Sequence, residues 1–357
     1  MKTACAKVVF YGAFDILIII YACKENGMRK GDSVTLQYAG RRLIQMIFSV
    51  FVVATVVFLM FRLLPGDPMT VLIEPGWSTE ARAMLAERFG LDRPLHEQYF
   101  LFMRNLVQGD FGHSFYYSRP ALDVLADKIA NTLILMLSAM IIAYGLGIIG
   151  GAFLAWYRGT KMESVGITLA LIFRALPPFF VGMMFIMFFS YRLGIFPHSG
   201  MRTPGYASEG PLLKFMTLDF LRHLALPMIV SGLYFLAQPL LIMRNTMMEV
   251  MGEDFIEMAH AKGLSNTRIM YKHAARNALL PVVTQGALFI GMAIGGQVLI
   301  EYVFGWPGLG REIVLAAQRH DYPVAQASFI IISALVMIMN FLADLFYSYL
   351  DPRVTIK

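Results

Sequence analysis

Residues 244–277 read RNTMMEVMGEDFIEMAHAKGLSNTRIMYKHAARN, a polar segment between two long apolar runs. Asp254 can cap a short helix, because its carboxylate can accept hydrogen bonds from the free N–H groups of the first turn. The apolar positions of that helix share one face at helical spacing: Phe255, Met258 and Ala259. Gly263 supplies the left-handed residue that ends such a helix. The segment therefore predicts a short helix lying crosswise between two membrane spans.

A second helix is expected to return the chain to the membrane. Ser265 can cap it, and its side chains are basic: Lys272, His273 and Arg276. A crosswise helix with a mixed apolar and charged surface suits a socket on a soluble partner. A surface hairpin that touches only lipid headgroups is the alternative interpretation.

The composition indicates an all-α membrane protein. Of 357 residues, 57% are hydrophobic and 15% are charged, with a mean hydropathy of +0.61, whereas a soluble chain carries about a quarter charged residues. A membrane span needs about 20 mostly apolar residues, and its backbone must satisfy its own hydrogen bonds, which favours helices. Six runs qualify: about 43–64, 132–157, 165–191, 224–243, 279–303 and 324–350.

The basic residues indicate which loops face the cytoplasm, since cytoplasmic loops are enriched in Lys and Arg. One set of loops holds Arg41, Arg42, Arg158, Lys161, Arg244, Lys262, Arg268, Lys272, Arg276, Arg353 and Lys357. The other set holds fewer: Arg202, Lys214, Arg222, Arg311 and Arg319. The segment 244–277 and the chain end are therefore expected inside. The net charge of +6 reflects this topology, and nothing in it predicts nucleic-acid binding.

Glu257-Met258-Ala259 followed by Gly263 resembles the EAA loop of ABC-transporter permeases, although that pattern has Ala where this chain has Met258. The longer string AKGLSNTRIMYKHAARNALLPVVT, residues 261–284, resembles the dipeptide, oligopeptide and nickel importer permeases. In that family this loop is the coupling helix, which sits in a cleft of the ATPase subunit. The resemblance implies these coupling residues: Asp254, Glu257, Met258, Ala259, Lys262, Gly263, Leu264, His273 and Arg276.

Further strings carry the resemblance from Tyr38 to Arg353: LLPGDP (63–68), GLDRPLHEQY (90–99), GDFGHS (109–114) and WPGLG (306–310). It implies a six-span permease with a first span at 38–64, a periplasmic helical excursion at 65–130, a transmembrane domain at 131–350 and a tail at 351–357. Within the excursion, helices are expected at about 78–89 and, capped by Asp92, from Leu95 to Leu106. In family members the excursion lies under the docked binding protein; packing over the span ends is the alternative role.

Residues 1–37 form an extension of doubtful status. Val8–Cys23 is apolar but short, and Asp15 lies in its middle, where a carboxylate is costly in lipid. Two interpretations remain open: translation begins at Met28, or the segment is a marginal seventh span. Both cysteines, Cys5 and Cys23, fall in this extension, so no disulfide is expected elsewhere.

The outer connection 304–323 contains prolines and glycines that favour irregular backbone, such as a re-entrant loop. Trp306 and Tyr322 fit an interfacial aromatic belt, or the loop with Trp306 and Pro307 forms an outer gate. Glu301, at the end of its span, is expected at the interface. Glycines within the spans are expected to allow close helix packing: Gly145, Gly147, Gly150, Gly151, Gly286, Gly291, Gly295 and Gly296.

Arg174 is an ionisable group at membrane depth, which makes it a candidate for function. It precedes Pro177 and Pro178, which should break or kink the helix. Relatives usually have Ser-x-Pro-x-Phe here, so this chain departs at Ala175 and Pro178. Arg174 and Pro177 are candidates for the substrate path, where the arginine would meet a substrate carboxylate. The alternative is that Arg174 snorkels or pairs with a partner subunit.

The chain has no phosphate-binding loop, no metal-ligand spacing and no nucleophile motif. No cofactor is expected on this chain; ATP and Mg would be used by partner ATPases. The resemblance implies a permease of a peptide importer, or alternatively of a nickel importer, in the bacterial inner membrane. Expected partners are a second, different permease, two ATP-binding subunits and a substrate-binding protein. An intramembrane enzyme or a stand-alone channel is the remote alternative.

Overall fold

The computed structural model describes residues 32–63, 93–205, 215, 217–295 and 298–350. The expectations for the Met28 start, the 78–89 helix, the Asp92 cap and the tail 351–357 lie outside these residues. Within the described ranges the regular structure is helical, apart from one β-bridge between His113 and Pro120. The fold is therefore all-α, as the composition predicts.

Four described helices are long and apolar enough to cross a membrane: α2 (Asp32–Leu63), α6 (Ala121–Trp156), α9 (Leu218–Val250) and α15 (Tyr322–Leu350). A fifth crossing is possible where α7 (Lys161–Ala175) meets α8 (Pro178–Phe185) and its π-helical continuation η1 (Ile186–Arg192). This pair is bent by 100°, so the third apolar run is broken at its prolines, as predicted.

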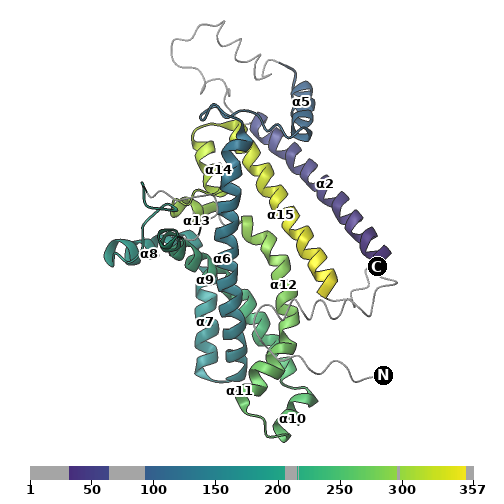
Figure 1. Ribbon diagram of the computed structural model, residues 1–357, viewed down its shortest axis with the longest axis vertical. Coiled ribbons are helices and arrows are strands. Elements are labelled where there is room, and N and C mark those ends of the chain that lie inside the picture. The colour runs from purple at the N-terminus through teal and green to yellow at the C-terminus, as the bar shows by residue number, and fades with distance from the viewer. Residues whose placement is uncertain (1–31, 64–92, 206–214, 216, 296–297, 351–357) are drawn as a thin grey trace.

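The remaining apolar run, 279–303, is divided between α12 (Ala275–Gly295) and the short α13 (Val298–Val303). α15 packs against α2 and α12, and α14 (Leu309–Gln318) packs against α15. Figure 1 shows α2, α15 and α12 side by side, with α6 and α9 on the other side of α12. The irregular backbone expected over 304–323 is present at 304–308 and at 319–321, whereas α14 fills residues 309–318 between them.

α6 and α9 form the most extensive helix pair among the described residues. A Cβ on Gly147 would lie 2.8 Å from Pro239 Cγ, and one on Gly151 would lie 2.5 Å from the Leu240 carbonyl oxygen. The expected packing role is thus confirmed for these glycines and for Gly286, where a Cβ would lie 2.7 Å from Tyr144. Gly145 has open space and Gly150 has ordinary contact, so the prediction was wrong for them.

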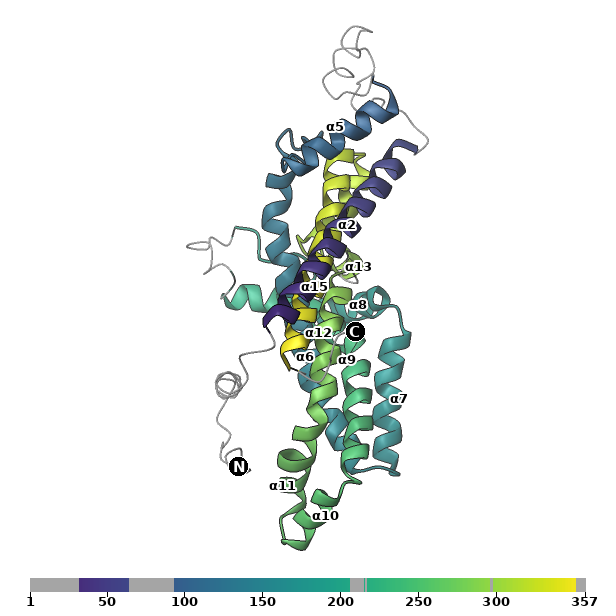
Figure 2. The ribbon, with the colours of Figure 1, turned by 90° about the vertical axis from the view of Figure 1, so that its right-hand side faces the viewer.

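The molecule is elongated, and α8 and α13 lie at its mid-height while other connections lie at its two ends (Figures 1 and 2). α10 (Asp254–Ala261) and α11 (Asn266–Arg268) lie at one end, together with the connection between α6 and α7. α5 (Leu95–Val107) and α14 lie toward the other end. The two basic loops therefore share one end, as the charge pattern requires. α5 begins at Leu95, after Pro94.

Candidate functional sites

The inner turn, residues 251–268, contains the expected crosswise helix. α10 ends at Ala261, and Gly263 follows with φ +72°, a conformation that favours glycine. The Gly263 N–H donates to the His260 carbonyl (2.9 Å) and the Leu264 N–H donates to the Ala259 carbonyl (3.3 Å). This pair of bonds is a Schellman motif, which satisfies carbonyls left open at a helix end. The stop predicted at Gly263 is confirmed.

The start of α10 differs from the prediction. Asp254 is the first helical residue, and the capping position belongs to Glu253, whose side chain makes no capping bond. The negative charge of Asp254 therefore lies in the first turn, where its attraction to the positive end of the helix dipole stabilises the helix. Ser265 does occupy the capping position of α11, without a side-chain bond.

α10 turns one apolar pair inward and another outward. Ile256 and Ala259 are buried against Met243 and Met247 of α9 and against Ile269. Phe255 and Met258 are exposed, at 38% and 56%. The expected single face of Phe255, Met258 and Ala259 was therefore wrong. The core holds α10 by Ile256 and Ala259 and leaves two large apolar side chains facing out.

The other predicted coupling residues surround this helix. Glu257, Lys262 and Gly263 are exposed, and Leu264 packs at the edge of the same core cluster. His273 is half-buried on the π-helical segment η3 (Ile269–Ala274), and Arg276 is exposed on α12. π-Helical turns are rare and often accompany functional sites. The structure thus places the predicted set on α10 and on the helix that returns from it.

An ion pair joins the inner end of α9, which leads into the inner turn, to the first turn of α7. Arg244, near the inner end of α9, donates from Nε to Glu163 Oε1 at 2.9 Å, and the Gly159 N–H donates to Glu163 Oε2 at 2.6 Å. Glu163 was not singled out from the sequence. Its signal was present, because Thr160-x-x-Glu163 is a capping-box pattern, and Thr160 indeed caps α7.

The broken helix places Arg174 against an aromatic ring. Leu176 is extended between α7 and α8, Pro177 occupies the capping position of α8, and Pro178 begins that helix. The Arg174 guanidinium carbon lies 4.4 Å from the centre of the Tyr234 ring on α9, which is within cation–π range. Among the described residues no carboxylate pairs with Arg174, so the substrate and partner-subunit interpretations both remain predictions.

The outer turn, residues 301–311, is buried at its centre, although Tyr302 is 41% exposed. Trp306 is 0% exposed, and its Nε1–H donates to the Asn131 carbonyl at 3.0 Å. The Asn131 side-chain amide donates to the Pro307 carbonyl at 2.8 Å. The expectation that Trp306 belongs to an interfacial belt was wrong, because this ring packs inside the protein between α6 and α9. Tyr322 is half-buried, with its ring edge-on to Phe61.

Glu301 begins the outer turn and is 0% exposed, so its expected interfacial position was also wrong. The Thr132 hydroxyl donates to Glu301 Oε1 at 2.6 Å, and the Arg311 N–H donates to Oε2 at 3.0 Å. Thr132 in turn accepts a bond from the Leu309 N–H at 2.9 Å. The carboxylate therefore joins α13, α6 and α14, and its hydrogen bonds compensate for its removal from water.

A second buried carboxylate fixes the excursion. The Ser114 hydroxyl donates to Asp321 at 2.5 Å, and the N–H groups of Phe115 and Tyr116 donate to the same carboxylate. Nearby, burial together with the charge of Glu312 raises the pKa of the Tyr117 hydroxyl. The string GDFGHS thus has a packing role in the structure. Within the described ranges, no group of three His, Cys, Asp or Glu residues could hold a metal ion.

A bundle of apolar helices with a crosswise helix at one end is the architecture of an ABC importer permease. The solved MetNI methionine ABC transporter in an inward-facing conformation has a chain of this fold, with a TM-score of 0.50 and 18% identity. The match covers 64% of this chain and 97% of that one.

The chain belongs to the family of binding-protein-dependent transport system inner membrane components, whose pattern matches residues 147–356. The N-terminal part of the same membrane component matches residues 35–136.

Three relatives are similar over nearly their whole length. The di/tripeptide transport system permease protein DppB of Pseudomonas aeruginosa is 37% identical over 332 residues, covering 89% of this chain and 98% of the relative. The dipeptide transport system permease protein DppB of Escherichia coli is 36% identical, covering 90% and 99%. The glutathione transport system permease protein GsiC of Escherichia coli is 33% identical, covering 90% and 100%.

Proposed function

We propose that this chain is a permease subunit of an ATP-driven importer for dipeptides and oligopeptides. The observation that carries the proposal is α10, whose inner pair is buried in the core while Phe255 and Met258 face out at one end of the molecule. Exposed apolar side chains beside charged ones are typical of a protein interface. The peptide class of the substrate follows from the names of the relatives.

The chain acts without catalytic chemistry of its own. Partner ATPases bind ATP and Mg, and α10 transmits their movement through Ile256 and Ala259 to the helices that pack on them. The Arg244–Glu163 pair extends this contact to the first turn of α7, and through the Gly159 N–H to the loop between α6 and α7. ATP hydrolysis and substrate passage can therefore belong to different subunits. A rigid helix that contacts both the ATPase and the permease core passes on a displacement, and no chemical reaction is needed at that contact.

The complete importer contains a second, homologous permease, two ATPases and a substrate-binding protein. One chain supplies half of the translocation pathway, and the second permease closes it around the substrate. A purified complex of this permease and ATPases alone that transports at the full rate would refute the heterodimer. Uptake of a labelled dipeptide, with nickel uptake as the comparison, in proteoliposomes with the binding protein distinguishes the peptide from the nickel importer.

Arg174 is proposed to face the pathway and to meet the substrate carboxylate. Its guanidinium packs on the Tyr234 ring beside the 100° break between α7 and α8, where the backbone is extended at Leu176. Arg174→Gln should reduce transport while assembly and basal ATP hydrolysis stay intact. Loss of assembly would assign the arginine to a subunit contact, and unchanged transport would remove it from both roles.

Gly263→Val tests the docking assignment. Valine is strained at φ +72°, so the helix stop should shift and displace α10. ATPase retention on the solubilised complex and ATP-driven transport should both fall. Gly109→Val is the matched control, because Gly109 has φ +78° and open space for a Cβ but follows α5 at the other end. Normal retention and transport in Gly263→Val would overturn the assignment.

A further inference from the structure

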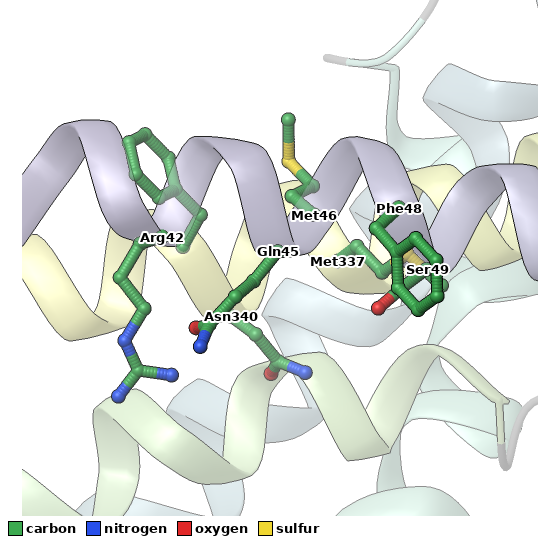
Figure 3. A pocket seen from close by; sticks show the side chains of 8 residues that line it. Arg42, Gln45, Met46, Phe48, Ser49, Met337 and Asn340 are labelled. Carbon is green, nitrogen blue, oxygen red and sulfur yellow. The ribbon is translucent and has the colours of Figure 1, made fainter.

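A pocket of about 380 Å³ lies between α2 and α15. Figure 3 shows Arg42, Gln45 and Asn340 at one end of this pocket, with Ser49 farther along α2 and Met337 beside it on α15. Its volume falls in the range of small-molecule sites. The pocket is separate from α10, from the outer turn and from the break beside Arg174.

The depth of the pocket follows from the position of its residues along α2. Arg42 stands immediately before the apolar run that begins at Leu43, so it marks the inner boundary of the membrane. At 1.5 Å per residue, Ser49 lies about 10 Å deeper. The pocket therefore begins at headgroup level and extends toward the acyl chains of the inner leaflet.

The polar lining is unusual at this depth. Gln45 and Asn340 line the pocket, and within the described part of the chain neither side-chain amide bonds to another protein group. An amide without a partner is costly in an apolar environment. A ligand that brings polar oxygens to this level would satisfy both amides, and the Arg42 guanidinium beside them favours a negatively charged ligand.

The apolar surroundings fit the rest of such a ligand. Met46 and Met337 line the pocket, and methionine adapts to flexible chains. Next to it, α2 exposes a continuous row of large apolar side chains: Ile44, Ile47, Phe48 and Phe51. A headgroup at Arg42 would therefore have its acyl chains along this row.

We propose that the pocket binds an anionic phospholipid of the inner leaflet. The phosphate lies at Arg42, the ester oxygens accept hydrogen bonds from Gln45 and Asn340, and the acyl chains pass Met46 and Met337. Basic pockets between helices on the cytoplasmic side are suited to such headgroups. The lipid would fill the space between the first and last spans, α2 and α15. This inference does not depend on which substrate the importer carries.

Native mass spectrometry of the full-length permease with its ATPases tests the site. The complex is titrated with phosphatidylglycerol and, separately, with phosphatidylcholine. Wild type should bind phosphatidylglycerol more tightly, and Arg42→Gln should weaken its binding on the order of five-fold. Arg41→Gln is the matched control, because it removes the same charge one residue away, outside the pocket lining. Asn340→Leu should weaken the binding of both lipids, because it removes a hydrogen-bonding group without changing the charge of the protein.

Three outcomes would overturn the proposal. An equal loss of phosphatidylglycerol affinity in Arg41→Gln and Arg42→Gln would show that the lipid is attracted only by the surface charge. Equal binding of phosphatidylglycerol and phosphatidylcholine by the wild type would show that the pocket is not a site for anionic lipid. Efficient cross-linking of a Ser49→Cys variant to the second permease, with no bound lipid, would show that a partner helix fills the groove. If Asn340→Leu does not assemble, Gln45→Leu supplies the same measurement from α2.

Discussion

The inner turn and the outer turn both connect helices and both depend on glycine, yet they direct their side chains in opposite ways. In the outer turn, Trp306 and Glu301 are fully buried, and their polar atoms bond to Asn131 and Thr132 of the same chain. In the inner turn, α10 buries only small and medium side chains and exposes Phe255 and Met258.

The difference separates two uses of a short connection. The outer turn completes its contacts within the subunit, so its residues act on the stability of the fold. The inner turn leaves apolar area uncovered, so its outward residues are expected to act on association with the proposed ATPase partner. Substitutions in the two turns should therefore fail in different assays.

Trp306→Ala should have the largest effect on stability. It removes a fully buried ring and its hydrogen bond to the Asn131 carbonyl, and such truncations cost about 3–5 kcal/mol. Denaturant unfolding of the solubilised permease measures the loss. Tyr302→Ala is the neighbouring control, since its side chain is 41% exposed. An equal loss in both variants would contradict the closed outer turn.

Gly310→Ala should destabilise the fold by about 1–3 kcal/mol through overpacking. A Cβ at this position would lie 2.5 Å from the Val298 Cα and 3.0 Å from the Glu301 carboxylate. Gly145→Ala on α6 meets open space and should be neutral or slightly stabilising. The same unfolding measurement compares them, and a neutral Gly310→Ala would mean that the turn is loosely packed.

The double variant Phe255→Ala, Met258→Ala should leave unfolding unchanged, because both side chains are exposed. It should weaken ATPase binding by about 1–3 kcal/mol, the range for central apolar contacts of an interface. Binding of the purified ATPase to the immobilised permease measures this change in binding free energy. Val107→Ala, an exposed apolar change on α5 at the other end, is the control. Unaltered ATPase affinity would remove α10 as the docking element.

Glu257→Gln should have the smallest effect. The side chain is exposed, and an exposed ion pair contributes only about 0–1 kcal/mol. ATPase affinity should fall slightly at low salt, and the difference from wild type should shrink at high salt, where such a pair is screened. A loss as large as that of the double variant would show that Glu257 becomes buried in the partner.

Local sequence was sufficient where a single residue type determines the backbone. Glycine at 263 indicated a left-handed helix stop, and the structure has φ +72° there. The apolar runs indicated the spans, and Pro177 indicated the break between α7 and α8. These features depend on a few neighbouring residues, so they can be read along the chain.

Other features depend on partners that are distant in sequence. Glu301 is buried because Thr132, 169 residues earlier, donates to it, and no local pattern shows that pairing. The orientation of α10 was missed for a different reason. Phe255 with Met258 and Ile256 with Ala259 have the same spacing, so periodicity alone gives no preference between the two pairs.

The length of α6 has a mechanical consequence. Near its outer end, Asn131 and Thr132 hold the outer turn; near its inner end, Ala152 and Ala155 pack in the cluster that contains Ile256 of α10. The 24 residues from Asn131 to Ala155 span about 36 Å. A straight rod of that length works as a lever, and a tilt of about 5° moves its far end by about 3 Å. If an ATPase docks at α10 as proposed, a small rotation there would shift the outer turn by about the width of a water molecule.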